Sequence, residues 1–188
     1  MRVLLIDAYR PDDPDRAVVD AAAKALRTNG HEIDRVDLVA DGFRAFMSEE
    51  ERDAYHTDEP LIADDAKASA QLVRRADAML FCYPTVTHTV PAVLKGWLER
   101  VLVLGVAFDF DDKGRIAPAM TRVRRIGAVT TTPHGWITTR RHGDLGRRTI
   151  MWTLRLNCNR LCRRTFVGVP TGAGGGSGPR IERALRRW

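Results

Sequence analysis

The chain has 188 residues, 44% of them hydrophobic, and a formal net charge of +6 at pH 7. This length suits one α/β domain with a complete core, and the hydrophobic content excludes an intrinsically disordered chain. No apolar run approaches the ~20 residues of a membrane span, and the run after Met1 is too short for a secretory signal. We expect a single domain over residues 1–188, located in the cytoplasm.

Short apolar runs alternate with longer segments whose apolar residues have helical spacing. In chain order, the pattern predicts a strand at 2–6, a loop at 7–15, a helix at 16–29, a weaker strand at 31–38, a short acidic helix capped by Ser48 and Glu51, a helix at 65–76, a strand at 78–83, a helix from Pro91 to Val101, a strand at 124–130, a helix at 149–161, a strand at 165–169, a glycine-rich loop at 171–178 and a helix at 180–188.

Five strands alternating with helices predict a parallel, doubly wound α/β sheet. In such sheets, ligands bind beyond the carboxyl ends of the strands, near the point where the strand order reverses. The loops at 8–15, 84–90 and 130–143 therefore become the candidate binding loops.

The first of these loops carries neither the G-x-G-x-x-G pattern of dinucleotide-binding turns nor a P-loop. A phosphate could still bind the amides at the start of the first helix, with Arg16 adding charge-assisted hydrogen bonds. Arg16 could equally pair with Asp12, Asp13 or Asp15. The sequence leaves both interpretations open.

The second loop lies between Pro84 and Pro91, which makes the connection stiff. Its backbone amides and small side chains, Thr85 to Val90, suit a flat hydrogen-bonding heterocycle such as an isoalloxazine. His88 by itself indicates little, because a lone loop histidine is usually only solvated.

The basic excess lies in the last third of the chain and is carried by arginine. The residues are Arg140, Arg141, Arg147, Arg148, Arg155, Arg160, Arg163, Arg164, Arg183, Arg186 and Arg187. Because no nucleic-acid-binding motif accompanies them, a solvated basic face is favoured over a nucleic-acid surface. Such a face would also attract a phosphorylated dinucleotide.

The cysteines are Cys82, Cys158 and Cys162, and the last two would share one face of the predicted helix at 149–161. A metal or redox pair is one interpretation. A structural zinc site needs four ligands, however, and the sequence offers no second pair. We expect two reduced, half-buried thiols and no metal.

The segment PAVLKGWLERV at 91–101, after a proline-led loop and before GVAF, resembles the NAD(P)H:quinone oxidoreductases of the DT-diaphorase type. That family includes modulator-of-drug-activity proteins and ancillary subunits of potassium efflux systems. The segments VLLIDAY, FMSEEERDAY and TTTPHGW…HGD support the resemblance. It implies a flavodoxin-like fold with strand order 2-1-3-4-5 and helices on both faces, a flavin (FAD or FMN), NAD(P)H as electron donor, a quinone-like acceptor and a homodimer with Trp97 and the 43–55 insert near its interface.

The resemblance also implies site residues. The cofactor-binding set is Tyr9 near the flavin phosphates, Arg16, Ala17 and Val18 at the helix start, Pro84, Thr85, Val86, Thr87 and His88 along the isoalloxazine, Thr130, Thr131 and Thr132 under its pyrimidine side, and Arg180 near the adenylate of FAD. His142 matches the catalytic histidine, with an ordinary pKa that suits proton exchange. Trp136 stands where a tyrosine is usual. Alternatively, His142 only caps the helix that begins near Asp144.

Several positions depart from the family pattern. Thr87 and His88 replace an aromatic pair, Arg16 replaces a phosphate-binding serine, and Thr132 and Pro133 replace two glycines. Besides a quinone reductase, the sequence therefore keeps open a nucleotide-sensing subunit of a potassium efflux system, a flavin reductase that supplies a monooxygenase, and a basic nucleic-acid binder.

Overall fold

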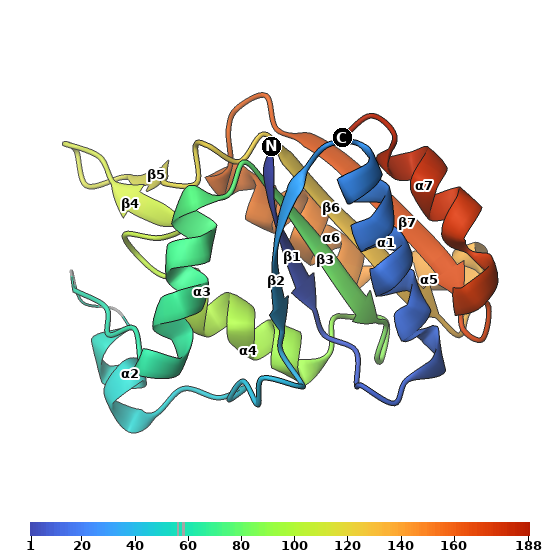
Figure 1. Cartoon of the computed structure of the whole chain (residues 1–188). Coiled ribbons are helices and arrows are strands. Elements are labelled where there is room, and N and C mark those ends of the chain that lie inside the picture. The colour runs from blue at the N-terminus through green and yellow to red at the C-terminus, as the bar shows by residue number, and fades with distance from the viewer. Residues whose placement is uncertain (56, 58) are drawn as a thin grey trace.

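The computed structural model describes residues 1–55, 57 and 59–188, and the side chain of Trp136 lies outside the described part. One five-stranded parallel sheet runs in the order β2-β1-β3-β6-β7 (Figure 1). The strands are β1 (Arg2–Asp7), β2 (Glu32–Asp37), β3 (Ala78–Pro84), β6 (Arg125–Thr132) and β7 (Arg163–Pro170). Numbered among themselves, these strands follow the order 2-1-3-4-5, so the predicted doubly wound sheet is confirmed.

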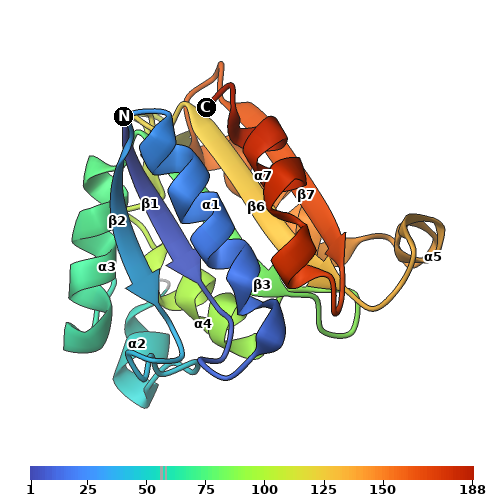
Figure 2. The same cartoon turned by 45° about the vertical axis from the view of Figure 1, so that its right-hand side comes forward.

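Helices cover both faces of this sheet, because successive side chains of a strand point to opposite sides. On β1, Val3 and Leu5 belong to one apolar core, whereas Leu4 and Ile6 belong to the other. The first core lies under α1 (Ala17–Thr28) and α7 (Gly178–Leu185), which lie side by side in Figure 2. The second lies under α3 (Asp64–Arg75) and α4 (Ala92–Val101). None of the described helices has the length and apolarity to cross a membrane.

The helix predicted at 149–161 is wrong at both ends. It begins earlier, as α6 (Leu145–Arg148), continues through a π-helical turn at Thr149–Thr153, and ends in a 3-10 turn at Leu154–Asn157. The Asn159 side chain accepts from the amide of Leu161, and its carbonyl accepts from the amide of Cys162, which favours a turn there. Cys158 and Cys162 therefore do not share a helix face. Both are free thiols and are buried, not half-buried as expected, and Cys82 is a buried free thiol as well.

A small antiparallel hairpin was not predicted. It pairs β4 (Phe108–Phe110) with β5 (Ile116–Pro118) outside the main sheet. Gly114 adopts a φ of +69° in its turn, and the Asp111 carboxylate accepts from the amides of Lys113 and Arg115. Strands of three residues are too short to leave a periodic signal in the sequence.

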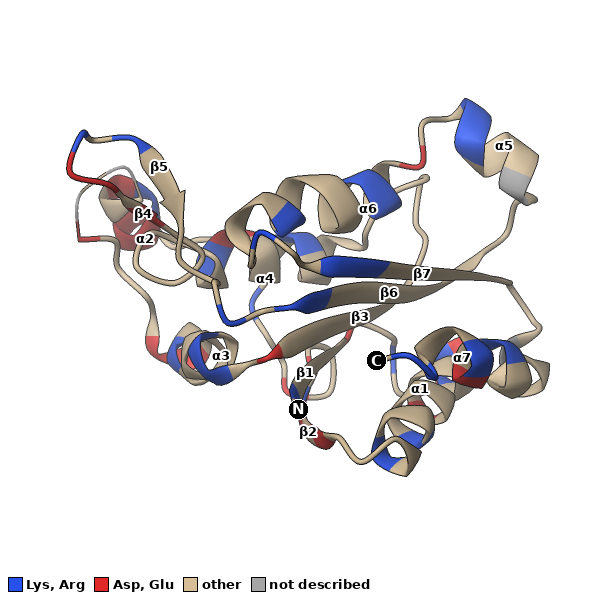
Figure 3. Ribbon diagram, turned by 90° about the horizontal axis from the view of Figure 1, so that it is seen from above, with Lys and Arg blue, Asp and Glu red and all other residues tan. Residues whose placement is uncertain are grey.

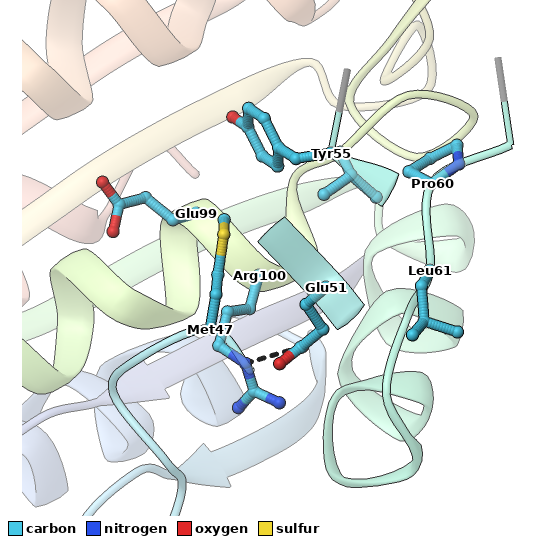
Figure 4. A pocket seen from close by; sticks show the side chains of 8 residues that line it. Met47, Glu51, Tyr55, Pro60, Leu61, Glu99 and Arg100 are labelled. Carbon is cyan, nitrogen blue, oxygen red and sulfur yellow. Dashed lines mark hydrogen bonds and ion pairs between the residues drawn. The ribbon is translucent and has the colours of Figure 1, made fainter. Parts of the chain in front are cut away.

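The predicted capping box of α2 (Glu49–Ala54) is present, and it belongs to a buried ion cluster. The Arg100 guanidinium donates to Glu51 at 2.8 Å and to both carboxylate oxygens of Asp65 at 2.8 and 2.6 Å. The Arg100 hydrogen bonds also hold the pKa of Asp65 below its ordinary value. Figure 4 shows Arg100 and Glu51 beside a shallow hollow between α2 and α4. This cluster fixes the acidic insert to the body of the domain.

Packing around the LKGW segment explains why a glycine and a tryptophan stand at positions 96 and 97. A Cβ atom on Gly96 would overlap the backbone of Ala45, so only glycine lets α4 lie this close to the insert. Trp97 is fully buried, donates to Ser69 Oγ at 3.0 Å and packs edge-on against Phe81. Its side chain belongs to the core of its own chain, and the expectation that Trp97 lies near a dimer interface stays a prediction.

Replacing Gly96 by alanine should lower the free energy of unfolding by about 3 kcal/mol, because the new methyl group meets backbone rather than a movable side chain. Urea denaturation monitored by circular dichroism measures the change. Gly178→Ala is the matched control, since nothing lies within 4 Å of the added Cβ. Equal stability of both variants would show that the contact is not constraining.

Candidate functional site

The floor of the candidate site is built around Tyr9, which follows β1. Its hydroxyl donates to the carbonyl of Tyr83 at 2.9 Å and accepts from the amide of Thr131 at 3.1 Å. It thereby joins the carboxyl ends of β1, β3 and β6. Tyr9 is fully buried, and burial raises the pKa of its phenol well above the ordinary value. It is a structural part of the floor, with no surface for a bound phosphate.

The first loop presents carboxylates rather than a free anion site. Arg16 pairs with Asp7, at 3.0 Å, and with Asp37, and not with the acids of its own loop. Asp13 accepts from the amide of Asp15 at 2.9 Å, and the Asp15 carboxylate accepts from the amide of Gly172. The carboxylates of Asp13 and Asp15 are therefore engaged with backbone amides of the chain itself, whereas the N-cap of α1 has no side-chain hydrogen bond.

The three cofactor-binding residues predicted at the helix start differ in their exposure. Arg16 is partly exposed but paired, Ala17 is exposed, and Val18 is buried in the core under α1. An incoming phosphate would have to compete with the carboxylates of Asp7 and Asp37 for the Arg16 guanidinium.

The second loop is a tight turn. The amides and carbonyls of Val86 and Thr89 pair with each other at 3.1 and 2.9 Å, and Thr87 and His88 between them adopt φ values of +48° and +60°. Positive φ is costly for residues other than glycine, and such outliers cluster at functional sites. The Thr85 amide is bonded to the carbonyl of Thr131, so part of the backbone expected to hold a heterocycle is used internally.

Three histidines connect the tips of the second and third loops. The His88 ring stacks on His142, with ring centroids 4.3 Å apart, and on His134, at 4.9 Å. Nδ1 of His88 is buried without a hydrogen-bond partner in the described structure. Burial, together with the neighbouring His142 and His134, lowers the pKa of His88. His142 is the C-cap residue after α5 (Trp136–Arg141), and the N-cap of the next helix is Asp144, so His142 does not cap that helix.

A cleft of about 1110 Å³ opens beside this stack, at the carboxyl ends of β6 and β7. Its lining residues are Thr85, Thr130, Thr132, His134, Gly135, Thr139, Arg140, Gly143, Asp144, Arg147, Arg148, Trp152, Thr153, Phe166, Gly168, Val169, Pro170 and Arg180. Of the predicted cofactor set, Thr85, Thr130, Thr132 and Arg180 meet here. Pro84, Val86, Thr87, His88 and Thr131 lie in or beneath the adjoining loops, and the side chain of Trp136 lies outside the described part.

The sequence missed the wall of the cleft formed by α6 and β7, including Arg147, Arg148, Trp152 and Phe166. Figure 3 shows the arginine positions on α5 and α6 above the sheet. The only signal was the arginine excess in the last third of the chain, which composition alone could not assign to a concave surface.

The family model for the flavodoxin-like fold matches residues 1–166. The chain belongs to the flavodoxin-like fold family. Among curated members, rat NAD(P)H dehydrogenase [quinone] 1 is 30% identical over 166 residues, covering 78% of this chain and 58% of that protein. FMN-dependent NADH:quinone oxidoreductase 1 of Pseudomonas putida is 33% identical over 115 residues, covering 58% and 50%. The chain thus spans about half the length of these relatives.

Solved structures of this flavodoxin-like family agree with the fold over the whole chain. NAD(P)H:quinone oxidoreductase from Methanothermobacter marburgensis superposes with a TM-score of 0.80 and 23% identity, covering 100% of this chain and 98% of that one. An FMN-dependent NADH-azoreductase from Bacillus anthracis, in complex with FMN, gives 0.74 at 12% identity, covering 99% and 98%.

The histidine stack should weaken as pH falls. Because stacking holds the His88 pKa below its ordinary ~6.5, the open loop binds protons that the stacked loop excludes, so acid favours opening. Amide hydrogen exchange across residues 134–144, corrected for intrinsic rates, should be faster at about pH 5.5 than at about pH 7.5.

The amides of α1 serve as the internal reference and should show no such difference. His88→Asn should abolish the pH dependence. Equal protection of residues 134–144 at both pH values would show that the histidine stack does not hold the second and third loops together.

Proposed function

We propose that this protein is a flavin-dependent NAD(P)H oxidoreductase that transfers hydride from NAD(P)H through a bound flavin to a quinone-like acceptor. The observation that carries this proposal is the large cleft at the carboxyl ends of β6 and β7 in a member of a family with quinone-reductase relatives. Its volume of about 1110 Å³ reaches the upper end of ordinary ligand pockets, which leaves room for a flavin and a second flat ligand.

The residues of the cleft suit the ring of a flavin. Thr85, Thr130 and Thr132 supply hydroxyl groups that can donate or accept, and Phe166 supplies an apolar face. Thr85 Oγ1 and Thr130 Oγ1 lie 2.8 Å apart, so these two side chains already hold each other in position. The fit is poorer at the first loop, where carboxylates surround Arg16. The cofactor-binding set stays a prediction, and the choice between FAD and FMN is open in this proposal.

A bound flavin would supply two-electron chemistry, accepting hydride from one substrate and giving it to another. The protein's task is to hold the substrates and to manage protons and charge. His142 is the proposed proton donor, because a neutral imidazole offers one N–H and one acceptor nitrogen, and its ring is exposed beside the cleft. Trp136 remains a predicted partner of His142.

A regulatory nucleotide- and flavin-binding subunit of a potassium efflux system is the second candidate. The substituted second and third loops favour it, because His88, His134 and His142 stack on one another where relatives in the resemblance have an apolar substrate pocket. A homodimer and a cytoplasmic location also stay predictions. If the insert contributes to a dimer, exposed residues such as Phe46, 70% accessible, would make the contact rather than Trp97.

Purified protein should show flavin absorption bands that bleach under anaerobic conditions when NADPH or NADH is added. A quinone added afterwards should restore the bands. Bleaching then identifies the electron donor, and the return of the bands identifies the acceptor. Bands that bleach with no acceptor turnover would favour the regulatory subunit. A colourless protein that neither FAD nor FMN reconstitutes would contradict both candidates.

His142→Ala should slow flavin reduction by NAD(P)H about a hundredfold, because a positioned acid–base group contributes at least that much. Stopped-flow absorbance measures the rate, and flavin fluorescence measures whether binding is retained. His134→Ala is the matched control, because it removes the other ring of the same stack. Unchanged reduction kinetics would remove His142 from the mechanism.

A further inference from the structure

The lining of the cleft is unusually basic. Arg140 of α5 and Arg147 and Arg148 of α6 line it from one face of the sheet, Arg180 of α7 comes from the other face, and we call these four residues the arginine wall. All of them are exposed, and within the described part of the chain only Arg147 has an acidic partner, Asp144 at 4.0 Å. Unneutralised guanidinium groups around a concavity concentrate positive potential there, and their planar forks suit phosphate oxygens.

The cleft also exposes an indole. Trp152 is 61% accessible although its neighbours Ile150 and Met151 are buried. It lies on the π-helical turn Thr149–Thr153, a rare geometry that often occurs at functional sites. The Arg164 guanidinium lies over the Trp152 ring at 4.3 Å, which leaves this flat side chain held in place beside the cleft. An exposed aromatic ring among arginines is suited to stack on a nucleobase whose phosphates bind the cations.

We propose that the arginine wall and Trp152 bind the phosphorylated adenosine end of NADPH, so that this donor is preferred over NADH. Adenine would stack on Trp152, and the 2′-phosphate, which NADH lacks, would bind the guanidinium groups of the wall. This inference rests on the proposed function for the identity of the donor. The first loop offers no equivalent cation, because its Arg16 guanidinium is already paired with Asp7 and Asp37.

A second copy of the chain is a less suitable occupant of this face. Exposed Trp152, Leu156 and Leu161 would offer apolar area for an interface. A twofold interface, however, brings the same patch of both copies together, and like charges from the two arginine walls would then repel.

Isothermal titration with adenosine 2′,5′-bisphosphate and with 5′-AMP tests the proposal without depending on turnover. The bisphosphate should bind about tenfold more tightly to the wild-type protein, because charge-assisted bonds to the added phosphate account for that factor. Arg148→Ala should remove most of this advantage, whereas Trp152→Ala should weaken both nucleotides alike. Arg183→Ala, which removes the same charge from α7 outside the cleft, should change neither affinity.

Equal binding of the two nucleotides, or equal effects of Arg148→Ala and Arg183→Ala, would overturn the proposal. It would also be overturned if saturation with FAD, but not with FMN, blocked the bisphosphate, because the wall would then serve the flavin adenylate. Dissociation of a dimer by Trp152→Ala in sedimentation velocity would assign the patch to an interface instead.

Kinetics separate this inference from the proposed function. In an active protein, Arg148→Ala should lower kcat/KM for NADPH about tenfold and leave that for NADH nearly unchanged. A protein that binds the bisphosphate as expected but never oxidises NAD(P)H would refute the proposed function while leaving the nucleotide site intact.

Discussion

The hydroxyl of Tyr9 joins three strands at the edge where a parallel sheet offers its ligand site. One oxygen bonds to the carbonyl of Tyr83 on β3 and to the amide of Thr131 on β6, while the backbone of Tyr9 continues β1. The base of every binding loop is therefore fixed in relation to the others. Above this floor, the tips of the second and third loops touch mainly through the rings of His88, His134 and His142. The site combines a base held by hydrogen bonds with an upper part held by stacked histidine rings.

Charge is divided across the site in a way that follows from this arrangement. Asp7 of β1 and Asp37 of β2 pair with Arg16, so that cation is already neutralised. On the other side, arginines of α5, α6 and α7 line the cleft with few acids between them. The proposed nucleotide would therefore place its phosphates toward these arginines. Orientation by the field of the protein costs no new contact at the moment of binding.

The sequence predicted what depends on local pattern. Fully apolar runs such as Ala78–Tyr83 predict strands buried on both faces, and the Ser48–Glu51 capping box predicts the start of a helix. The partners of Arg16 could not be read in the same way, because Asp37 lies at the end of another strand. The cleft combines α6, the π-helical turn and β7, and no periodicity links segments that meet only through folding. Thr85, Thr130 and Thr132 were predicted from the family resemblance, and they meet at the cleft because the carboxyl ends of neighbouring parallel strands lie at one edge of the sheet.

The strand order leaves β2 and β7 at the two open edges of the sheet. Both carry ionised side chains: Glu32, Asp34 and Arg35 on β2, and Arg163 and Arg164 on β7. An unpaired edge is a template on which another polypeptide can add a strand, and charge at the edge makes that addition unfavourable. The arginine excess thus also reaches the edge strand β7, where Arg163 and Arg164 disfavour edge-to-edge aggregation of the sheet at high protein concentration.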